Sequence, residues 1–196
     1  PALKKKWFPP ALRMVICIPS GITEVEMRAV RESAERVNGK EVYLIHEPMA
    51  AAIGIGLDIM QPKGNMIVDI GGGTTEDLKS PPEDKSIQGR DLLTGKPKQV
   101  HVSYREIAKA LDKSILRVED AVMETLSQTP PELAADIYNT GIYLAGGGSM
   151  LRGLDRRLSQ KTDLPVYIAE DPLRAVVRGT GIALKNIERY KSILIK

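Results

Sequence analysis

The chain has 196 residues, enough for one domain or two small ones with a substantial hydrophobic core. A hydrophobic fraction of 42% and a charged fraction of 27% are ordinary for a globular protein, while a net charge of only +3 and an aromatic fraction of 4% argue against a nucleic acid as partner. One cysteine allows no internal disulfide, and the two histidines have no companions at metal-ligand spacing, which disfavours a zinc site.

The first ten residues are basic and flanked by prolines. They favour a solvated lead-in segment. The alternative is a peripheral membrane contact, with Lys4 to Lys6 facing anionic lipid and Trp7-Phe8 at the interface. The longest apolar run, Met49 to Leu57, is too short to span a membrane, and no signal peptide is visible. Because the chain begins with Pro1 and enters a strand almost at once, we expect that processing or truncation has removed what preceded it.

Strands and helices alternate in the first third of the chain. Met14 to Ile18 predicts a buried strand. The spacing of Thr23 and Glu26 predicts a capping box at the start of a helix that Asn38-Gly39 ends. Val42 to Ile45 predicts the next strand. This alternation is typical of an α/β domain.

A second helix is predicted to start at Glu47-Pro48, because proline suits the first turn of a helix. Its residues Met49 to Ala52 are mostly small, so we expect another segment to pack very close to it. Ligands of α/β folds sit at the carboxyl ends of strands. Glu47 and Asp69 both fall at strand ends, so one crevice could hold both.

The stretch from Asn65 to Thr75 predicts a phosphate-binding turn. A short apolar strand carries Asp69 near its end and runs into glycines and threonines, which are Gly71, Gly72, Gly73, Thr74 and Thr75. Glycine has no Cβ, so backbone N–H groups can approach an anion closely, and an aspartate at the strand end can hold the hydrated Mg²⁺ that accompanies phosphates. A glycine-rich hairpin without a ligand stays the alternative.

A polar segment follows this turn. Glu76 to Ser86 contains two adjacent prolines, which exclude a central strand and indicate a loop, a linker or a join. Gln88 to Val102 then has strand-turn-strand character around Thr94 to Pro97. Its Gly95-Lys96 pair lacks the spacing of a Walker motif, so Lys96 is expected at the surface.

A long helix is predicted next. Ser103 and Glu106 form a capping box. An apolar stripe at helical spacing follows, made of Ile107, Leu111, Ile115, Val118, Val122 and Leu126. It predicts a core-facing helix, or two collinear ones, with a partner-binding face as the lesser alternative. Thr129 to Glu132 is expected to cap a shorter helix that runs to Asn139 and ends at Gly141.

The last part of the chain contains a second glycine turn. Ile142 to Ala145 predicts a strand, followed by Gly146, Gly147 and Gly148 and by a helix that carries Met150, Leu151, Leu154 and Leu158. A strand, three glycines and a helix start indicate a turn that faces an anion or a nucleotide.

Two further elements are expected after this turn. Val166 to Ala169 predicts a last strand, and Asp171-Pro172 is expected to cap the last main helix, which runs through Ala183. Tyr190 to Lys196 is expected to be an extension or an edge strand.

Five runs of this sequence resemble one family. Ile45 to Gly54 and Val68 to Thr75 are similar to motifs of the actin-like ATPase superfamily. Thr129 to Ile137, Leu144 to Leu154 and Leu164 to Pro172 resemble the rod-shape-determining bacterial actins of the MreB family. Chaperone-like ATPases and sugar kinases belong to the same superfamily. The runs Thr129 to Ile137 and Leu164 to Pro172 argue against both of them. The resemblance covers nearly the whole chain, and its motifs occur in the family's order.

This resemblance implies an α/β fold of the actin-like (ribonuclease H-like) ATPase kind, present in part. It also implies ATP with Mg²⁺ as cofactors and polymerisation into filaments that organise cell-wall synthesis and maintain cell shape. The implied partners are other copies of the chain, the inner membrane surface and the cell-wall elongation machinery. The implied location is the cytoplasm, peripheral at the inner membrane.

The resemblance also assigns roles to individual residues. Asp69 matches the magnesium-side aspartate, and Gly71 to Thr74 match the turn that cradles the phosphates. Glu47 and Thr74 match the pair that positions the attacking water, a role that suits a reaction catalysed mostly by positioning and charge stabilisation. Gly146 to Gly148 match the adenosine motif. His46 is assigned no catalytic role.

Two parts of the family's pattern are missing from the sequence, an amino-terminal phosphate hairpin and an internal subdomain. The organisation expected is therefore a remainder of the first large subdomain with a crossover helix in residues 1–64, and a second large subdomain in residues 65–196 with an internal deletion near residues 75–77. The parent family is a weak ATPase. Since part of the nucleotide site is missing, the alternative is a truncated, non-catalytic structural or interaction module.

Overall fold

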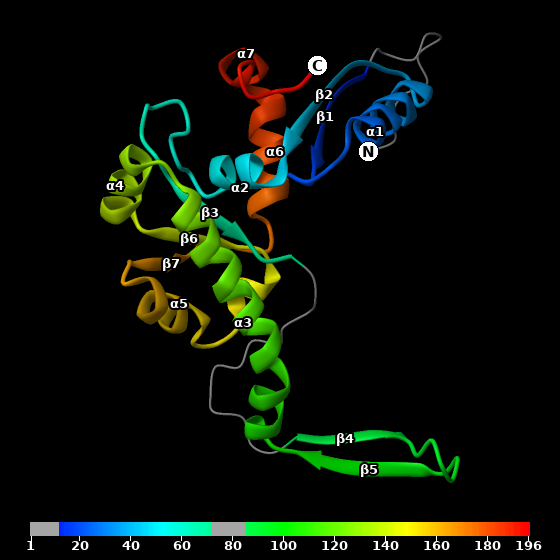
Figure 1. Cartoon of the computed structure of the whole chain (residues 1–196). Coiled ribbons are helices and arrows are strands. Elements are labelled where there is room, and N and C mark those ends of the chain that lie inside the picture. Colours follow the sequence, from blue (N-terminus) through cyan, green and yellow to red (C-terminus); the bar gives the residue numbers. More distant parts are fainter. Residues whose placement is uncertain (1–11, 72–84) are drawn as a thin grey trace.

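The computed structural model describes residues 12–71 and 85–196 of the chain. Its first part is a two-stranded parallel sheet, β1 (Leu12–Ile18) and β2 (Gly39–His46), connected by α1 (Glu24–Arg36) (Figure 1). The predicted capping box is present, because the hydroxyl of Thr23 accepts the N–H of Glu26 and the carboxylate of Glu26 accepts the N–H of Thr23. These strands and the helix appear where the sequence predicts them.

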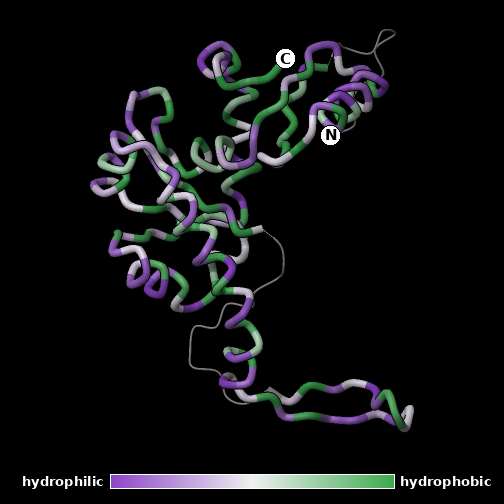
Figure 2. The backbone as a smooth tube through the Cα atoms, viewed as in Figure 1, coloured by the Kyte–Doolittle hydropathy of each residue, from purple (hydrophilic) through white to green (hydrophobic). Residues whose placement is uncertain are grey.

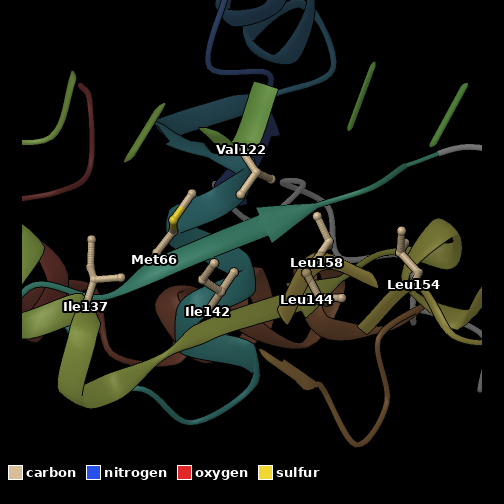
Figure 3. Packing of buried hydrophobic residues seen from close by; sticks show 7 residues of the cluster. All are labelled: Met66, Val122, Ile137, Ile142, Leu144, Leu154 and Leu158. Atoms are coloured by element: carbon tan, nitrogen blue, oxygen red, sulfur yellow. The ribbon is translucent and has the colours of Figure 1, made fainter. Parts of the chain in front are cut away.

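A second parallel sheet carries the main core. β3 (Met66–Asp69), β6 (Ile142–Ala145) and β7 (Val166–Ile168) lie in the order β3-β6-β7. One face packs against α3 (Tyr104–Gln128), α4 (Pro131–Thr140) and α5 (Leu154–Thr162). Figure 3 shows the buried side chains that these elements bring together, which are Met66, Val122, Ile137, Ile142, Leu144, Leu154 and Leu158.

Strand alternation decides what each face of this sheet meets. Met66 and Val68 of β3 belong to the core beneath α3 to α5, whereas Ile67 packs on the opposite face. That face meets α2 (Glu47–Gly54) and α6 (Ala175–Lys185) through a cluster of small residues, in which Ala51 and Ala175 are fully buried. The second sheet therefore lies between two layers of helices.

The α2–α6 contact is very close, as the small residues after Glu47-Pro48 predict. A Cβ placed on Gly54 would lie 1.8 Å from the carbonyl oxygen of Ala175, and a Cβ on Gly179 would lie 1.7 Å from that of Ala50. Only glycine at both positions lets the two backbones approach in this way. Because α2 leads into the second sheet and α6 also packs on β1, this contact joins the two sheets.

The end of the chain returns to the first sheet. α7 (Ile187–Tyr190) and the residues after it pack with Ile45 and Ile53, and Ile195 makes an antiparallel bridge with Leu44. The sequence predicted an extension or an edge strand here, and the structure has a single bridge, between Leu44 and Ile195. The division of the chain after residue 64 stays a prediction.

The predicted strand-turn-strand segment is an antiparallel hairpin, β4 (Lys85–Arg90) and β5 (Pro97–Val102), which projects from the body at the start of α3 (Figure 1). α3 is one continuous helix with the predicted capping box at Ser103 and Glu106. Its apolar stripe joins the core from Ile115 onward, where Val122 is buried, whereas Ile107 near the start of the helix is 41% exposed. Within residues 12–71 and 85–196, no helix combines the length and apolar character needed to cross a bilayer.

Arg157 of α5 ties this helix to α3. Its guanidinium donates to Glu119 and, at 2.6 Å, to Asp112. Glu119 is 3% exposed, so the cation compensates a carboxylate that is almost fully removed from water. Loss of Arg157, whose own side chain is partly exposed, would leave this buried carboxylate without its compensating charge and would destabilise the fold.

Three predicted helix starts differ in detail from the structure, although α4 does begin within the expected run Thr129 to Glu132. The hydroxyl of Thr129 donates to the carbonyl of Thr125 at the end of α3, so Pro130 occupies the N-cap position of α4 without a side-chain cap. α6 begins at Ala175, beyond Asp171-Pro172, because the carbonyl of Pro172 instead accepts the N–H of Gly146. After the second glycine turn, Gly147–Met150 forms a 3₁₀ turn, and the α-helix starts only at Leu154.

The close approach of α2 and α6 predicts that Gly179→Ala lowers the free energy of unfolding by about 2–3 kcal/mol, since the added methyl group must push two backbones apart. Urea denaturation measures the change. Gly181→Ala is the matched control in the same helix, because a Cβ there meets open space, and it should raise stability by about 0.5–1 kcal/mol through helix propensity. Equal effects of the two substitutions would contradict the packing argument.

Candidate functional site

The carboxyl ends of the strands converge on one cavity. It has a volume of about 860 Å³ and is lined at one end by Glu47, Asp69 and Gly71. This volume suits a small-molecule ligand. The other end runs beneath α3 along β3, where Val118 and Val122 line it. Among the described strands β3 is an edge strand, so the cavity combines a polar end at the strand termini with an apolar end along the sheet edge.

Glu47 is placed by the junction between β2 and α2. β2 ends at His46, and Glu47 is the first residue of α2, followed by Pro48 in the first turn. A carboxylate in the first turn interacts favourably with the helix dipole. The junction thus fixes Glu47 at the mouth of the cavity on a rigid element.

Asp69 is placed by the end of β3. It pairs with Ala145 of β6, and the next residue, Ile70, donates its N–H to the carbonyl of Ala145 at 2.9 Å. Strand alternation puts Asp69 on the same face as Ile67, the face that meets α2. Glu47 and Asp69 therefore line one cavity from neighbouring elements.

Burial raises the pKa of the Asp69 carboxyl above its usual range. The cost of holding this charge away from water would fall if a cation bound beside it. Among the described residues no group of three acidic, histidine or cysteine side chains could hold a metal alone. One carboxylate fits Mg²⁺, which keeps most of its waters and binds through one or two carboxylates together with phosphate oxygens.

Cys17 of β1 lies in the same electrostatic neighbourhood. Burial raises the pKa of its thiol, a hydrogen bond with Thr180 opposes the rise, and the charges of Glu47 and Asp69 add to it. Side chains from three elements, β1, α2 and β3, are therefore close enough to influence one another. Because its pKa is raised, the Cys17 thiol is protonated and therefore unreactive at neutral pH.

The second glycine turn packs directly on Asp69. A Cβ on Gly146, whose φ is +78°, would lie 2.4 Å from Oδ1 of Asp69 and 2.5 Å from the carbonyl oxygen of Ile70. A Cβ on Gly148 would lie 2.2 Å from the Ile70 side chain. Glycine is required here because any side chain would displace the end of β3.

The N–H groups of this turn are largely used inside the protein. Gly146 donates to the carbonyl of Pro172 at 2.9 Å, and Gly148 donates to the carbonyl of Ile70 at 2.8 Å. These two glycines hold the carboxyl end of β3 in place. Both N–H groups are therefore already paired within the protein, and neither glycine is among the residues that line the cavity.

Four predicted site residues, Gly72, Gly73, Thr74 and Thr75, lie outside the described residues. Their roles stay predictions. The cavity is also lined by residues that the sequence did not single out as site residues, among them Ser20 and Arg117. Ser20 follows the carboxyl end of β1, the same strand-end signal that singled out Glu47. Arg117 is next to the apolar stripe of α3, and its position gives no comparable signal.

The chain is similar to known proteins along most of its length. A family model described as MreB/Mbl protein matches residues 2–79 and 77–192. The chain is 37% identical to the cell shape-determining protein Mbl of Bacillus subtilis (strain 168), covering 90% of this chain and 69% of the relative. It is 38% identical to the cell shape-determining protein MreB of Escherichia coli (strain K12), covering 92% and 67%. The alignment to Mbl extends over 230 residues, so the relative has residues at positions where this chain has none.

Solved structures give the same result. MreB5 of Spiroplasma citri bound to AMPPNP has a TM-score of 0.83 and 30% identity, covering 93% of this chain and 71% of that one. The form bound to ADP has a TM-score of 0.80 and 31% identity. The MamK double helical filament, at 22% identity and a TM-score of 0.67, shows the likeness of fold alone. The α/β, actin-like fold expected from the sequence is confirmed.

Gly146→Ala should both destabilise the protein and disturb Asp69. Its backbone conformation is almost restricted to glycine, which costs about 1–3 kcal/mol for alanine, and the added methyl group would contact the carboxylate. Gly141→Ala is the matched control, since Gly141 has a similar conformation and a Cβ there would also approach a carbonyl oxygen, that of Pro165 at 2.6 Å. Both variants should lose stability, and only Gly146→Ala should shift the Asp69 carboxyl carbon resonance and its titration in NMR spectra.

The raised pKa of Asp69 predicts a pH-dependent penalty. Between the unfolded and the folded pKa the native state binds more protons than the unfolded state, so stability falls as pH rises through that window. Asp69→Asn removes the penalty. The variant should therefore be more stable than the wild-type chain at neutral pH, and the difference should vanish at pH values below the ordinary aspartate pKa. Thermal unfolding across pH tests this, with the exposed Asp120→Asn as control. A difference that grows on acidification would contradict it.

Proposed function

Because the chain belongs to the MreB/Mbl family, we propose that it binds ATP with Mg²⁺ at the polar end of the cavity and assembles with copies of itself into filaments. The single observation that carries this proposal is the placement of Glu47 and Asp69 on one cavity. Gly146 supports it, since the absence of a side chain there leaves room for the Asp69 carboxylate.

The described residues have distinct proposed roles. Asp69 holds a hydrated Mg²⁺, and its partial burial makes a cation the favourable neighbour. Glu47 orients the attacking water from the start of α2. Gly146 to Gly148 lie against the adenosine. When bound, Mg²⁺ neutralises charge on the phosphate oxygens.

The phosphate-binding turn completes the proposed site. Gly71, Gly72 and Gly73 donate backbone N–H groups to the phosphates, and Thr75 adds a hydroxyl. Thr74 shares with Glu47 the positioning of the water. Gly71 is the described residue of this group, and it lines the same cavity as Asp69.

The relatives support nucleotide binding. MreB5 of Spiroplasma citri is bound to AMPPNP in one aligned structure and to ADP in another. Self-association into filaments is proposed from the resemblance of the sequence motifs. Mbl and MreB are cell shape-determining proteins. We extend the proposal accordingly to filaments in the cytoplasm, peripheral at the inner membrane, that work with the cell-wall elongation machinery to maintain cell shape.

A second candidate function is a non-catalytic structural or interaction module. It is favoured by the two-part match to the family model and by the alignment to Mbl, in which this chain lacks residues that the relative has. Each charge-assisted hydrogen bond lost from the phosphates removes about 1.5–3 kcal/mol. Several such losses lower the affinity for ATP by orders of magnitude.

Calorimetric titration of ATP with Mg²⁺ into the full chain separates the two functions. We expect Asp69→Ala to weaken Mg²⁺-dependent binding at least about tenfold, a change of about 1.4 kcal/mol. Glu47→Gln should retain binding and lower the rate of hydrolysis about a hundredfold. Glu35→Gln, an exposed carboxylate on α1, is the control and should change neither. If the wild-type chain binds no ATP while it still self-associates in light scattering, the structural module is the correct function.

A further inference from the structure

The tip of the β4–β5 hairpin exposes two adjacent leucines. Leu92 and Leu93 are each 97% exposed, more than any other large hydrophobic side chain of the described residues. The hairpin projects from the start of α3, far from both sheets (Figure 1). Figure 2 shows an apolar stretch at its end and strands of mixed hydropathy behind it. Exposed leucines so far from the core contribute nothing to folding through burial.

The turn that carries these leucines is held together by its own hydrogen bonds. The Asp91 carboxylate accepts the N–H groups of Leu93 and Thr94 at 2.9 and 3.1 Å, and the N–H of Gly95 donates to the Asp91 carbonyl at 2.8 Å. The Arg90 side chain donates to the Gly95 carbonyl at 3.0 Å. Because these polar groups are already hydrogen-bonded within the turn, the free-energy cost of moving the turn from water into a medium poor in water is smaller.

Positive charge exceeds negative charge along the hairpin. Between Lys85 and Val102 the chain has four lysine or arginine residues and one acidic residue. That acidic residue, Asp91, is paired with Lys98 at 3.4 Å, and Lys96 is exposed beside the turn. An apolar tip with cations around it is complementary to an anionic lipid surface, which offers hydrocarbon below a layer of negative headgroups.

The two strands of the hairpin differ in polarity between their faces. Ile87 and Val100 are opposite each other and about half exposed on one face, while Gln88 and Gln99 are opposite each other on the other face. The same face carries the Gly89–Lys98 pair nearer the turn, so a cation lies between this apolar pair and the leucine tip.

We propose that the β4–β5 hairpin inserts Leu92 and Leu93 into the surface of an anionic bilayer. This inference rests on the proposed peripheral membrane association and gives that association a contact site. The site is separate from Lys4 to Phe8, the segment for which the sequence alone offered a membrane contact. It is also separate from the nucleotide cavity.

Co-sedimentation of the full chain with vesicles tests the proposal. Vesicles contain phosphatidylglycerol and phosphatidylcholine, or phosphatidylcholine alone. Leu92→Ser with Leu93→Ser should weaken binding to the anionic vesicles at least tenfold. Val25→Ser with Val177→Ser removes two exposed valines elsewhere, 78% and 66% exposed, and should leave binding unchanged. Lys96→Gln should weaken binding to the anionic vesicles about fivefold.

Three outcomes would overturn the proposal. The first is a wild-type chain that binds neither vesicle. The second is a leucine variant that binds like the wild type, with binding lost instead in Trp7→Ala with Phe8→Ala. The third is a leucine variant that keeps vesicle binding but loses self-association in analytical ultracentrifugation, which would assign the tip to contact with a second copy. ATP titration of the leucine variant should match the wild type, so a failure of the nucleotide proposal would be seen independently.

A fluorescence reporter gives a second measurement. The chain has one tryptophan, so Trp7→Phe with Leu93→Trp places a single reporter at the tip. Anionic vesicles should shift its emission to shorter wavelength, as expected for an indole that leaves water. Emission that stays unchanged while the protein co-sediments with the vesicles would overturn the proposal.

Discussion

The structure depends on the close contact between α2 and α6. Gly54 and Gly179 let these helices approach until a single methyl group on either would meet a carbonyl oxygen. The contact binds the first sheet, which α6 also touches, to the second sheet, which α2 leads into. Glu47 is the first residue of α2, and Ala51 of the same helix packs with Ile67 and Ala145 of the second sheet, so the helix that α6 holds also places Glu47 near the end of β3.

Close packing that only glycine allows is also found at the candidate site. Gly146 leaves room for the carboxylate of Asp69, and the turn around it donates its N–H groups to Pro172 and Ile70. The fold thereby holds the Asp69 carboxylate partly buried. Its raised pKa means that the charged form lowers the stability of the folded state. A site that costs stability in the absence of a ligand is typical of functional positions, since a neighbouring cation would remove the cost.

Local signals in the sequence were reliable where neighbouring residues alone decide the conformation. The capping boxes at Thr23 and Ser103 formed, and β6 has the predicted bounds. The caps expected at Thr129 and Asp171 did not form. The Thr129 hydroxyl bonds locally to the carbonyl four residues earlier in α3, whereas α6 starts three residues after Pro172, whose carbonyl accepts the N–H of the distant Gly146.

The sequence by itself determined the family, the order of strands and helices, and the strand-end positions of Glu47 and Asp69, because motifs and hydrophobic period are local properties of the chain. Only the tertiary structure decided that Gly146 packs on Asp69 and that Arg117 lines the same cavity. It also decided that Ile107 near the start of α3 and the leucine tip stay exposed. These facts depend on which distant segments meet, and that is set by the packing of whole elements against one another.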